Sequence, residues 1–248
     1  MMTSDAGIEI RFPPASGKIA LSKFIGFRCT GEIGGFGGMH SPNAQSLGLI
    51  VDALNARYKK TMRTLHHLWL SPFCRKVRLV LNEKRLDFQM RTEAVWERNE
   101  DFLKLNPVGE VPVLIEADGT ALSDSAAICE FLDEVHPEPA LIGHQAVARA
   151  EARRLVYWFD HKFHVEVTKN LVDEKITKRF LGLGEPVSKA IRAGHANIHH
   201  HLDYIGYLAD RRRWLAGDYL SMADLAAAAH LSCVDYLGDV PWEQHPSA

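Results

Sequence analysis

From residue 64 onward, the spacing of apolar positions changes several times, and each change marks a predicted element. The apolar run that ends at Leu70 is typical of a buried strand, whereas Val77, Val80 and Leu81 recur at helical spacing. Further on, Asp118-Gly119 is a hairpin turn signal between two short apolar runs. The predicted elements are, in order, a strand at 64–70, a helix at 72–84, a strand at 87–95, a helix at 99–105, strands at 111–116 and 120–122, and a helix that Ser123 or Asp124 caps.

This order of elements, βαβαββα, predicts an α/β unit in which helices pack on a mixed sheet. The proline-rich segment 136–139 then marks a boundary, because the pattern beyond it is helical throughout. Helices are expected at 146–169 and 187–211, followed by an alanine-rich helix at 225–234. Ser221 and Asp224 precede that last helix as a variant of the capping box, which is a structural role. The fold class is therefore α/β plus all-α.

Residues 1–61 differ from the rest of the chain. They contain 9 of the 18 glycines and show no sustained apolar period apart from a possible short helix at 44–58. Such a segment buries too little apolar surface to offset the entropy of ordering it, so we expect it to be disordered. Met62 stands directly before the first predicted strand. We therefore expect that translation begins at Met62 and that the preceding residues are not part of the working protein.

Composition narrows the class of function. The formal net charge of -2 gives no reason to expect binding to nucleic acid or to an anionic membrane. No apolar run approaches the length of a membrane span. The four cysteines are widely separated and form neither metal-ligand pairs nor a disulfide framework, so a reducing cytoplasm is the expected compartment. His195 and His199 share a helix face, but no comparable carboxylate or cysteine completes a ligand set, and no metal is expected.

The segment 71–78 is the strongest candidate for chemistry. Ser71 can cap the helix that follows, and Pro72 occupies its first position, where a missing N–H is harmless. The partial positive charge of a helix N-terminus lowers the pKa of a nearby thiol. Ser71 could therefore hydrogen-bond an incoming thiolate, or Cys74 could itself be the thiolate. The third possibility is a well-capped helix in which Cys74 faces the core.

Val111-Pro112 is a second candidate. A proline at the start of a strand cannot donate to the ladder, and an X–Pro bond can be cis at modest cost. A cis bond here would expose the backbone groups of Val111 to an extended peptide laid alongside as an added strand. The alternative is an edge-strand proline with no further role.

Together these features resemble the glutathione transferase superfamily, over the whole chain from Met62. The resemblance rests on four motifs, at 71–78, 106–114, 122–128 and 217–224. It implies a thioredoxin-like domain at 62–138, a helical domain at 142–248 and a homodimer.

The resemblance also implies a glutathione site. Ser71 would face the thiol of glutathione, Val111 would pair with its backbone through the cis-proline turn of Pro112, and Asp124 and Ser125 would hold its γ-glutamyl end.

The chain departs from this family at three points. Glu110 stands where the family often has a basic or amide residue, and its carboxylate would repel the glycyl carboxylate of glutathione by roughly 1 kcal/mol. Asp124 is one methylene shorter than the residue common at that place. The sequence stops at Ala248, where the family continues through another helix, so the C-terminal domain is expected to be truncated.

The run 62–78 is similar to one branch in particular, the bacterial glutathione-transferase-like proteins that bind the division GTPase FtsZ. This resemblance implies a non-enzymatic protein that acts on FtsZ filaments at the septum. The alternative is an enzyme that conjugates glutathione to electrophiles, with Ser71 stabilising the thiolate. Trp96, a large aromatic residue flanked by charges, is either an anchor for a partner or packs over the short helix.

Overall fold

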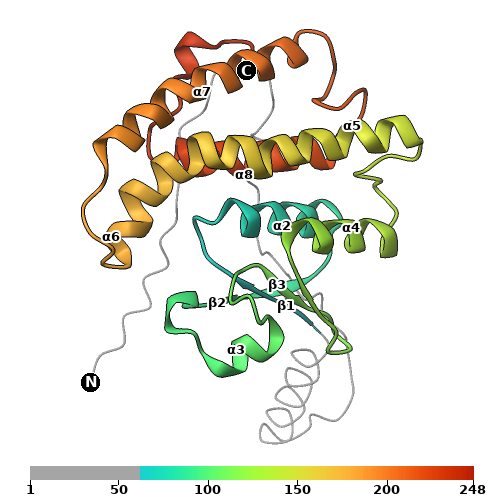
Figure 1. The fold of residues 1–248 in the computed structure, drawn as a ribbon. Coiled ribbons are helices and arrows are strands. Elements are labelled where there is room, and N and C mark those ends of the chain that lie inside the picture. Colours follow the sequence, from blue (N-terminus) through green and yellow to red (C-terminus); the bar gives the residue numbers. More distant parts are fainter. Residues whose placement is uncertain (1–61) are drawn as a thin grey trace, which may run out of the picture.

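The computed structural model describes residues 62–248, which form a small sheet unit and a larger helical region (Figure 1). The expectations for residues 1–61, namely disorder, a short helix at 44–58 and a start at Met62, lie outside the described residues. Across residues 62–248, none of the helices is both long and apolar enough to pass through a membrane.

The sheet has four strands in the order β2-β1-β3-β4. Strand β1 (Arg63–His67) pairs in parallel with β2 (Phe88–Thr92) and antiparallel with β3 (Val113–Ile115), which pairs antiparallel with β4 (Ala121–Ser123). Strands β1, β2 and β3 are shorter than predicted, and β4 has the predicted length. β1 ends early because the apolar residues that follow it belong to the turn that leads into the first helix. The mixed sheet itself confirms the predicted fold class.

Helices α2 and α4 cover the face of the sheet that is turned toward the helical region (Figure 1). Ser71 caps α2 and Pro72 begins it, as predicted, while the apolar face of α2 packs into a core with Leu65 of β1 and Ile128 of α4. The helices of this unit are α2 (Pro72–Glu83), the 3₁₀ turn η2 (Val95–Glu97), α3 (Glu100–Leu105) and α4 (Ser125–Val135).

The first helix of the helical region is longer than the predicted 146–169. The polar stretch 168–175 does not end it, because Lys175 pairs with Asp239 at 2.6 Å and Lys178 pairs with Glu174 at 2.7 Å. The middle of this helix has π geometry. The elements of the region are α5 (Ala146–Tyr157), the π-helical η3 (Trp158–Thr177), α6 (Lys178–Phe180), α7 (Ser188–Ala209), α8 (Met222–Asp235) and the 3₁₀ turn η4 (Trp242–Gln244).

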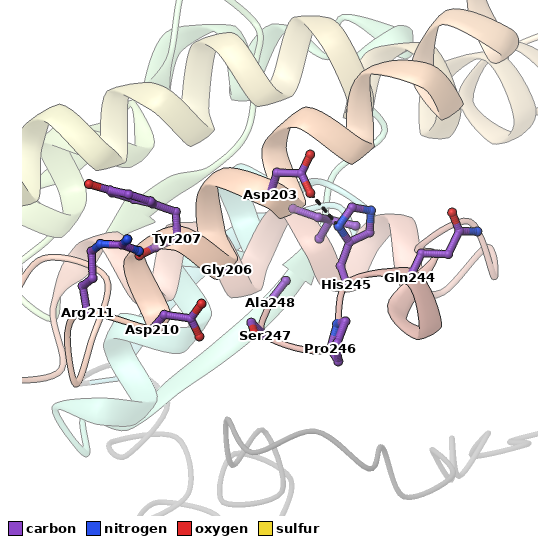
Figure 2. A pocket seen from close by; sticks show the side chains of 11 residues that line it. Asp203, Gly206, Tyr207, Asp210, Arg211, Gln244, His245, Pro246, Ser247 and Ala248 are labelled. Atoms are coloured by element: carbon purple, nitrogen blue, oxygen red, sulfur yellow. Dashed lines mark hydrogen bonds and ion pairs between the residues drawn. The ribbon is translucent and has the colours of Figure 1, made fainter.

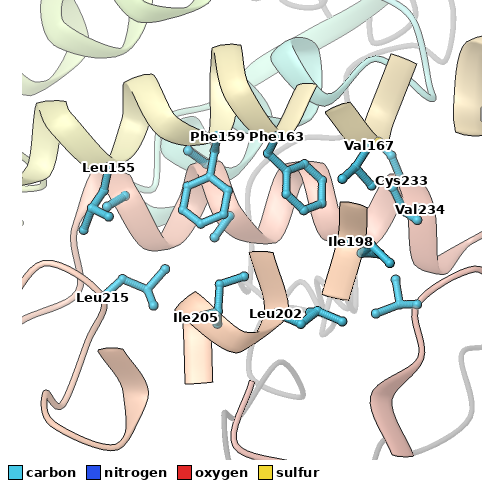
Figure 3. Close-up of a cluster of buried hydrophobic side chains, with 14 of the residues drawn as sticks. Leu155, Phe159, Phe163, Val167, Ile198, Leu202, Ile205, Leu215, Cys233 and Val234 are labelled. Carbon is cyan, nitrogen blue, oxygen red and sulfur yellow. The ribbon is translucent and has the colours of Figure 1, made fainter. Parts of the chain in front are cut away.

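The core of the helical region lies between three helices (Figure 3). Phe159, Phe163 and Val167 of η3 are fully buried and point toward α7 and α8. Ile198 and Leu202 of α7 fill the opposite side. Residues 159, 163, 167 and 171 recur at every fourth position and so form one apolar stripe along η3.

The capping box predicted for the alanine-rich helix is present at the start of α8. The backbone N–H of Ser221 donates to Asp224 Oδ2 at 2.9 Å, and the N–H of Leu215 donates to Asp224 Oδ1 at 2.8 Å. Asp224 therefore ties the segment before α8 to the helix. Burial raises the pKa of its carboxyl, although these hydrogen bonds oppose the rise.

A buried lysine holds the segment that joins the two parts. Lys84 Nζ donates to Asp133 Oδ1 at 2.8 Å and to the carbonyl oxygens of His136 and Pro139 at 2.6 and 3.0 Å. Asp133 in turn accepts hydrogen bonds from the backbone N–H groups of Leu141 and Ile142. We name Lys84 and these partners the linker clamp. It fixes the direction in which the chain enters the helical region.

Candidate functional site

Ser71 lies at the N-terminus of α2, half-buried, in the turn after β1. Its Oγ accepts a hydrogen bond from the N–H of Cys74 at 3.2 Å, and its own N–H donates to the carbonyl oxygen of Leu68 at 3.4 Å. Because the hydroxyl oxygen serves as an acceptor in the cap, the hydroxyl proton is left to donate elsewhere. This is the geometry that a group hydrogen-bonding an incoming thiolate requires.

Cys74 does not have the properties of a reactive thiol. Its side chain is fully buried, and its Sγ accepts a weak hydrogen bond from the N–H of Leu68 at 3.5 Å. Burial raises the pKa of the thiol, and the hydrogen bond with Ser71 offsets only part of that rise. The lowered pKa expected from the helix N-terminus is therefore wrong for Cys74, because desolvation outweighs the effect of the dipole. Cys74 faces the core.

The Val111–Pro112 bond is cis, and Pro112 is buried immediately before β3. No hydrogen bond within 62–248 uses the backbone of Val111. The neighbouring Glu110 has an exposed side chain, while its carbonyl oxygen accepts a hydrogen bond from Asn106 Nδ2 at 2.8 Å. The carboxylate of Glu110 is therefore free to meet a ligand, and its backbone is fixed.

Asp124 caps α4 with one carboxylate oxygen. Its Oδ1 accepts hydrogen bonds from the N–H groups of Ala126 and Ala127 at 2.8 and 3.0 Å, and its backbone is left-handed, with φ of 71°. Within the described residues, its Oδ2 takes part in no hydrogen bond, and the side chain is exposed. Ser125, which follows, is buried with 5% of its surface exposed.

The sheet register brings these positions to one end of the sheet. Val113 pairs with His66 on one side and with Ser123 on the other. Continuing the same register by two residues places Val111 beside the end of β1, just before Ser71, and beside the start of α4. Three of the predicted site positions, Ser71, Val111 and Asp124, therefore converge, and Glu110 lies with them. Trp96 follows β2, whose last residue Thr92 pairs with His67, so its segment leaves the sheet at this end as well. The capping box of α8 belongs to the helical region.

A buried polar cluster behind α2 was not predicted. Lys76 is fully buried and its Nζ donates to Asp160, while His230 Nε2 lies 3.4 Å from Asp160 Oδ1. His230 Nδ1 lies 3.0 Å from Thr168 Oγ1. Burial acts to raise the pKa of Asp160, but His230 and Lys76 outweigh it and hold that pKa below its ordinary value. The signal in the sequence was the position of Lys76, four residues before Val80 on the apolar face of α2.

Trp96 connects the sheet unit to the helical region. It lies in η2, is 41% exposed, and meets Phe180 of α6 edge-on with ring centroids 5.1 Å apart. The two interpretations of Trp96 were a partner anchor or packing over the short helix α3. Its aromatic partner belongs instead to the helical region, and part of the indole remains accessible.

A pocket of about 360 Å³ lies between α7 and the last described residues (Figure 2). His245 and Asp203 face one another across part of it, with 3.0 Å between Nδ1 and Oδ1. Tyr207 and Arg211 line its other side, with the ring and the guanidinium stacked 3.8 Å apart. None of the site residues predicted from the sequence lines this pocket.

The chain is similar to a known protein family and to known proteins. Residues 70–135 match the family model "Glutathione S-transferase, N-terminal domain". The chain is 47% identical to FtsZ-localized protein A of Caulobacter vibrioides over 189 residues, which is 75% of this chain and 83% of that protein.

Solved structures with a similar fold include two bacterial proteins. One is a glutathione S-transferase from Rhodospirillum rubrum F11, 61% identical with a TM-score of 0.74, and the other is FzlA from C. crescentus, 46% identical with a TM-score of 0.72. Each comparison covers 75% of this chain and 84% of the other. The chain therefore belongs to the glutathione S-transferase superfamily, in the branch that includes FtsZ-localized protein A.

Proposed function

We propose that this protein binds FtsZ filaments at the bacterial division septum and acts there without catalysing a reaction. The observation that carries the proposal is the 47% identity to FtsZ-localized protein A across 83% of that relative. The exposed carboxylate of Glu110 supports it, because it opposes the carboxylate-bearing ligand of the superfamily at the converging end of the sheet. A cytoplasmic location follows from the same proposal.

The proposed FtsZ-binding surface is centred on Trp96 and Phe180. The two residues are 41% and 71% exposed, and their rings meet across the boundary between the sheet unit and the helical region. Leu183, in the loop after α6, is also exposed. A half-exposed tryptophan held by a second aromatic ring is a typical anchor, since its conformation is fixed before a partner arrives.

Co-sedimentation tests this proposal. The purified protein is mixed with FtsZ from Caulobacter vibrioides polymerised with GTP and is expected in the pellet. Trp96→Glu should weaken the association, because a carboxylate would replace the apolar anchor. Tyr219→Glu is the matched control, since Tyr219 is an 82% exposed aromatic residue in the loop before α8. A parent protein that stays in the supernatant contradicts the proposal.

Glutathione conjugation is the second candidate, and the free hydroxyl proton of Ser71 favours it. Two of the residues suit groups of glutathione. Ser71 could donate a hydrogen bond to its thiolate, and Asp124 Oδ2 could accept a hydrogen bond from its α-ammonium group. Glu110 does not suit the glycyl carboxylate. Calorimetric titration with glutathione and turnover of a model electrophile decide between the candidates. If the protein is a transferase, Ser71→Ala should abolish turnover while glutathione still binds.

We further infer a homodimer, the usual assembly in this superfamily. Sedimentation-velocity centrifugation at several protein concentrations should show a species of twice the chain mass. A single species at the chain mass under all conditions would contradict the inference.

A further inference from the structure

Two arginines lie one turn apart on α2, close to the boundary with α8. Arg75 Nη1 donates to Ser232 Oγ of α8 at 2.8 Å. Arg75 Nη2 and Arg78 Nη2 donate to the same acceptor, the carbonyl oxygen of Trp69, at 3.5 and 3.1 Å. Both side chains are half-buried. The two guanidinium groups therefore converge on one point at the junction of the sheet unit and the helical region.

Among residues 62–248, no carboxylate balances this charge. Neither arginine forms an ion pair with any acidic side chain in residues 62–248, whereas Arg63, Arg153, Arg154 and Arg212 all do. Burial, followed by the charge of Arg75, lowers the pKa of Arg78. The remaining groups near Arg78 include Cys74 and Cys233, whose thiol pKa values are raised. Two neighbouring positive charges thus have only neutral acceptors.

Trp69 adds an apolar surface at the same place. Its side chain is 56% exposed, with Arg78 Cζ 5.4 Å from the ring centroid and His67 edge-on at 4.8 Å. Such an exposed indole beside guanidinium groups can cover a flat ligand while the arginines bind its charged end.

We propose that Arg75, Arg78 and Trp69 form a binding site for a small aromatic carboxylate at the junction of α2 and α8. The planar fork of a guanidinium matches the two oxygens of a carboxylate. A phosphate ion would pair with the two arginines but would make no apolar contact with the indole of Trp69. A carboxylate on an aromatic body can contact all three residues. This site requires neither glutathione nor FtsZ.

The test is calorimetric titration of residues 1–248 with 1-naphthoate, 1-naphthamide and inorganic phosphate. The naphthamide has the same apolar body without the charge. We expect saturable binding of 1-naphthoate, weakened by added NaCl, and binding of 1-naphthamide at least about tenfold weaker, as the loss of a charge-assisted hydrogen bond predicts. Arg75→Gln should weaken 1-naphthoate binding by about the same factor. Arg192→Gln, which removes an exposed arginine of α7, should leave it unchanged.

Further variants keep the result interpretable if Arg75→Gln fails to fold. Arg75→Lys retains the charge without the fork and should give intermediate affinity, while Trp69→Ala should reduce the preference for 1-naphthoate over phosphate. Circular dichroism checks the fold of each variant. Equal affinity for the carboxylate and the amide, no effect of Arg75→Gln, or no binding of 1-naphthoate at millimolar concentration would each overturn the proposal. Phosphate binding as tight as that of 1-naphthoate would overturn the role of Trp69.

Discussion

At the scale of single residues, the candidate site has an exposed carboxylate beside it, that of Glu110. Its side chain is exposed and lies where Ser71, Val111 and Asp124 converge. An exposed charge acts over a short range and through solvent, so its effect on a ligand is modest in energy and sensitive to salt.

Glu110→Lys should therefore tighten glutathione binding by about tenfold, because it exchanges a repulsion for an attraction. Titration calorimetry at two NaCl concentrations measures the change, which should shrink as salt rises. Glu134→Lys, at an exposed position on α4, controls for the change in net charge. An equal gain in both variants would show that Glu110 has no special position.

One buried and one half-buried histidine supply a second prediction at this scale. Burial is the main cause that lowers the pKa of His67 and of His164 to about 4, from 6.5. Between pH 6.5 and 4 the unfolded chain therefore binds protons that the folded chain does not. The free energy of unfolding should fall as the pH is lowered through this window, and should be fully restored above it.

His164→Gln should make that decline shallower, since one of the two groups no longer titrates. Urea unfolding at a series of pH values measures it, and His161→Gln, at an exposed position on the same helix, serves as the control. Parallel curves for the parent and His164→Gln would contradict the assignment.

At the scale of elements, the sequence predicted the order of strands and helices, because turn signals and apolar spacing are local. It misjudged the end of the long helix, since the partners that stabilise residues 168–175, such as Asp239, are distant in the chain. The same limit applies to the site. Ser71 was identifiable from its cap, whereas the burial of Cys74 and the pairing of Lys76 with Asp160 depend on packing between helices.

The start of α8 gives the prediction for this scale. Ser221→Ala removes the cap hydrogen bond from the N–H of Ala223 and the hydrogen bond that Ser221 Oγ donates to Asp224 Oδ2, and should lower stability by about 0.5–2 kcal/mol. Asp224→Ala should cost more, because it also releases Leu215. Thermal melting compares both with Ser188→Ala, an exposed serine in the first turn of α7. Variants that melt like the parent but lose FtsZ binding would show that this motif is not structural.

At the scale of the whole molecule, buried charges cross the boundary between the two parts. Lys76 belongs to the sheet unit, Asp160 and His230 to the helical region. Removing one member of a buried pair leaves the other uncompensated, which costs far more than the pair itself contributes.

Lys76→Met should lower the free energy of unfolding by roughly 3–5 kcal/mol. The double variant Lys76→Met with Asp160→Leu should recover much of that loss, because no charge then remains buried without a partner. Chemical denaturation of the four proteins of this cycle gives the coupling energy. Additive effects would mean that the two residues do not depend on one another.

The linker clamp has a consequence for dividing the protein. A cut at 140 would remove Leu141 and Ile142 from Asp133 and would leave Lys76 of the first fragment without Asp160. Each fragment would then expose apolar surface and a charge whose counterpart is on the other. Such fragments are expected to aggregate when each is expressed alone and to assemble when both are expressed together. The two fragments would therefore form a complementation pair, in which recovery of solubility reports their association.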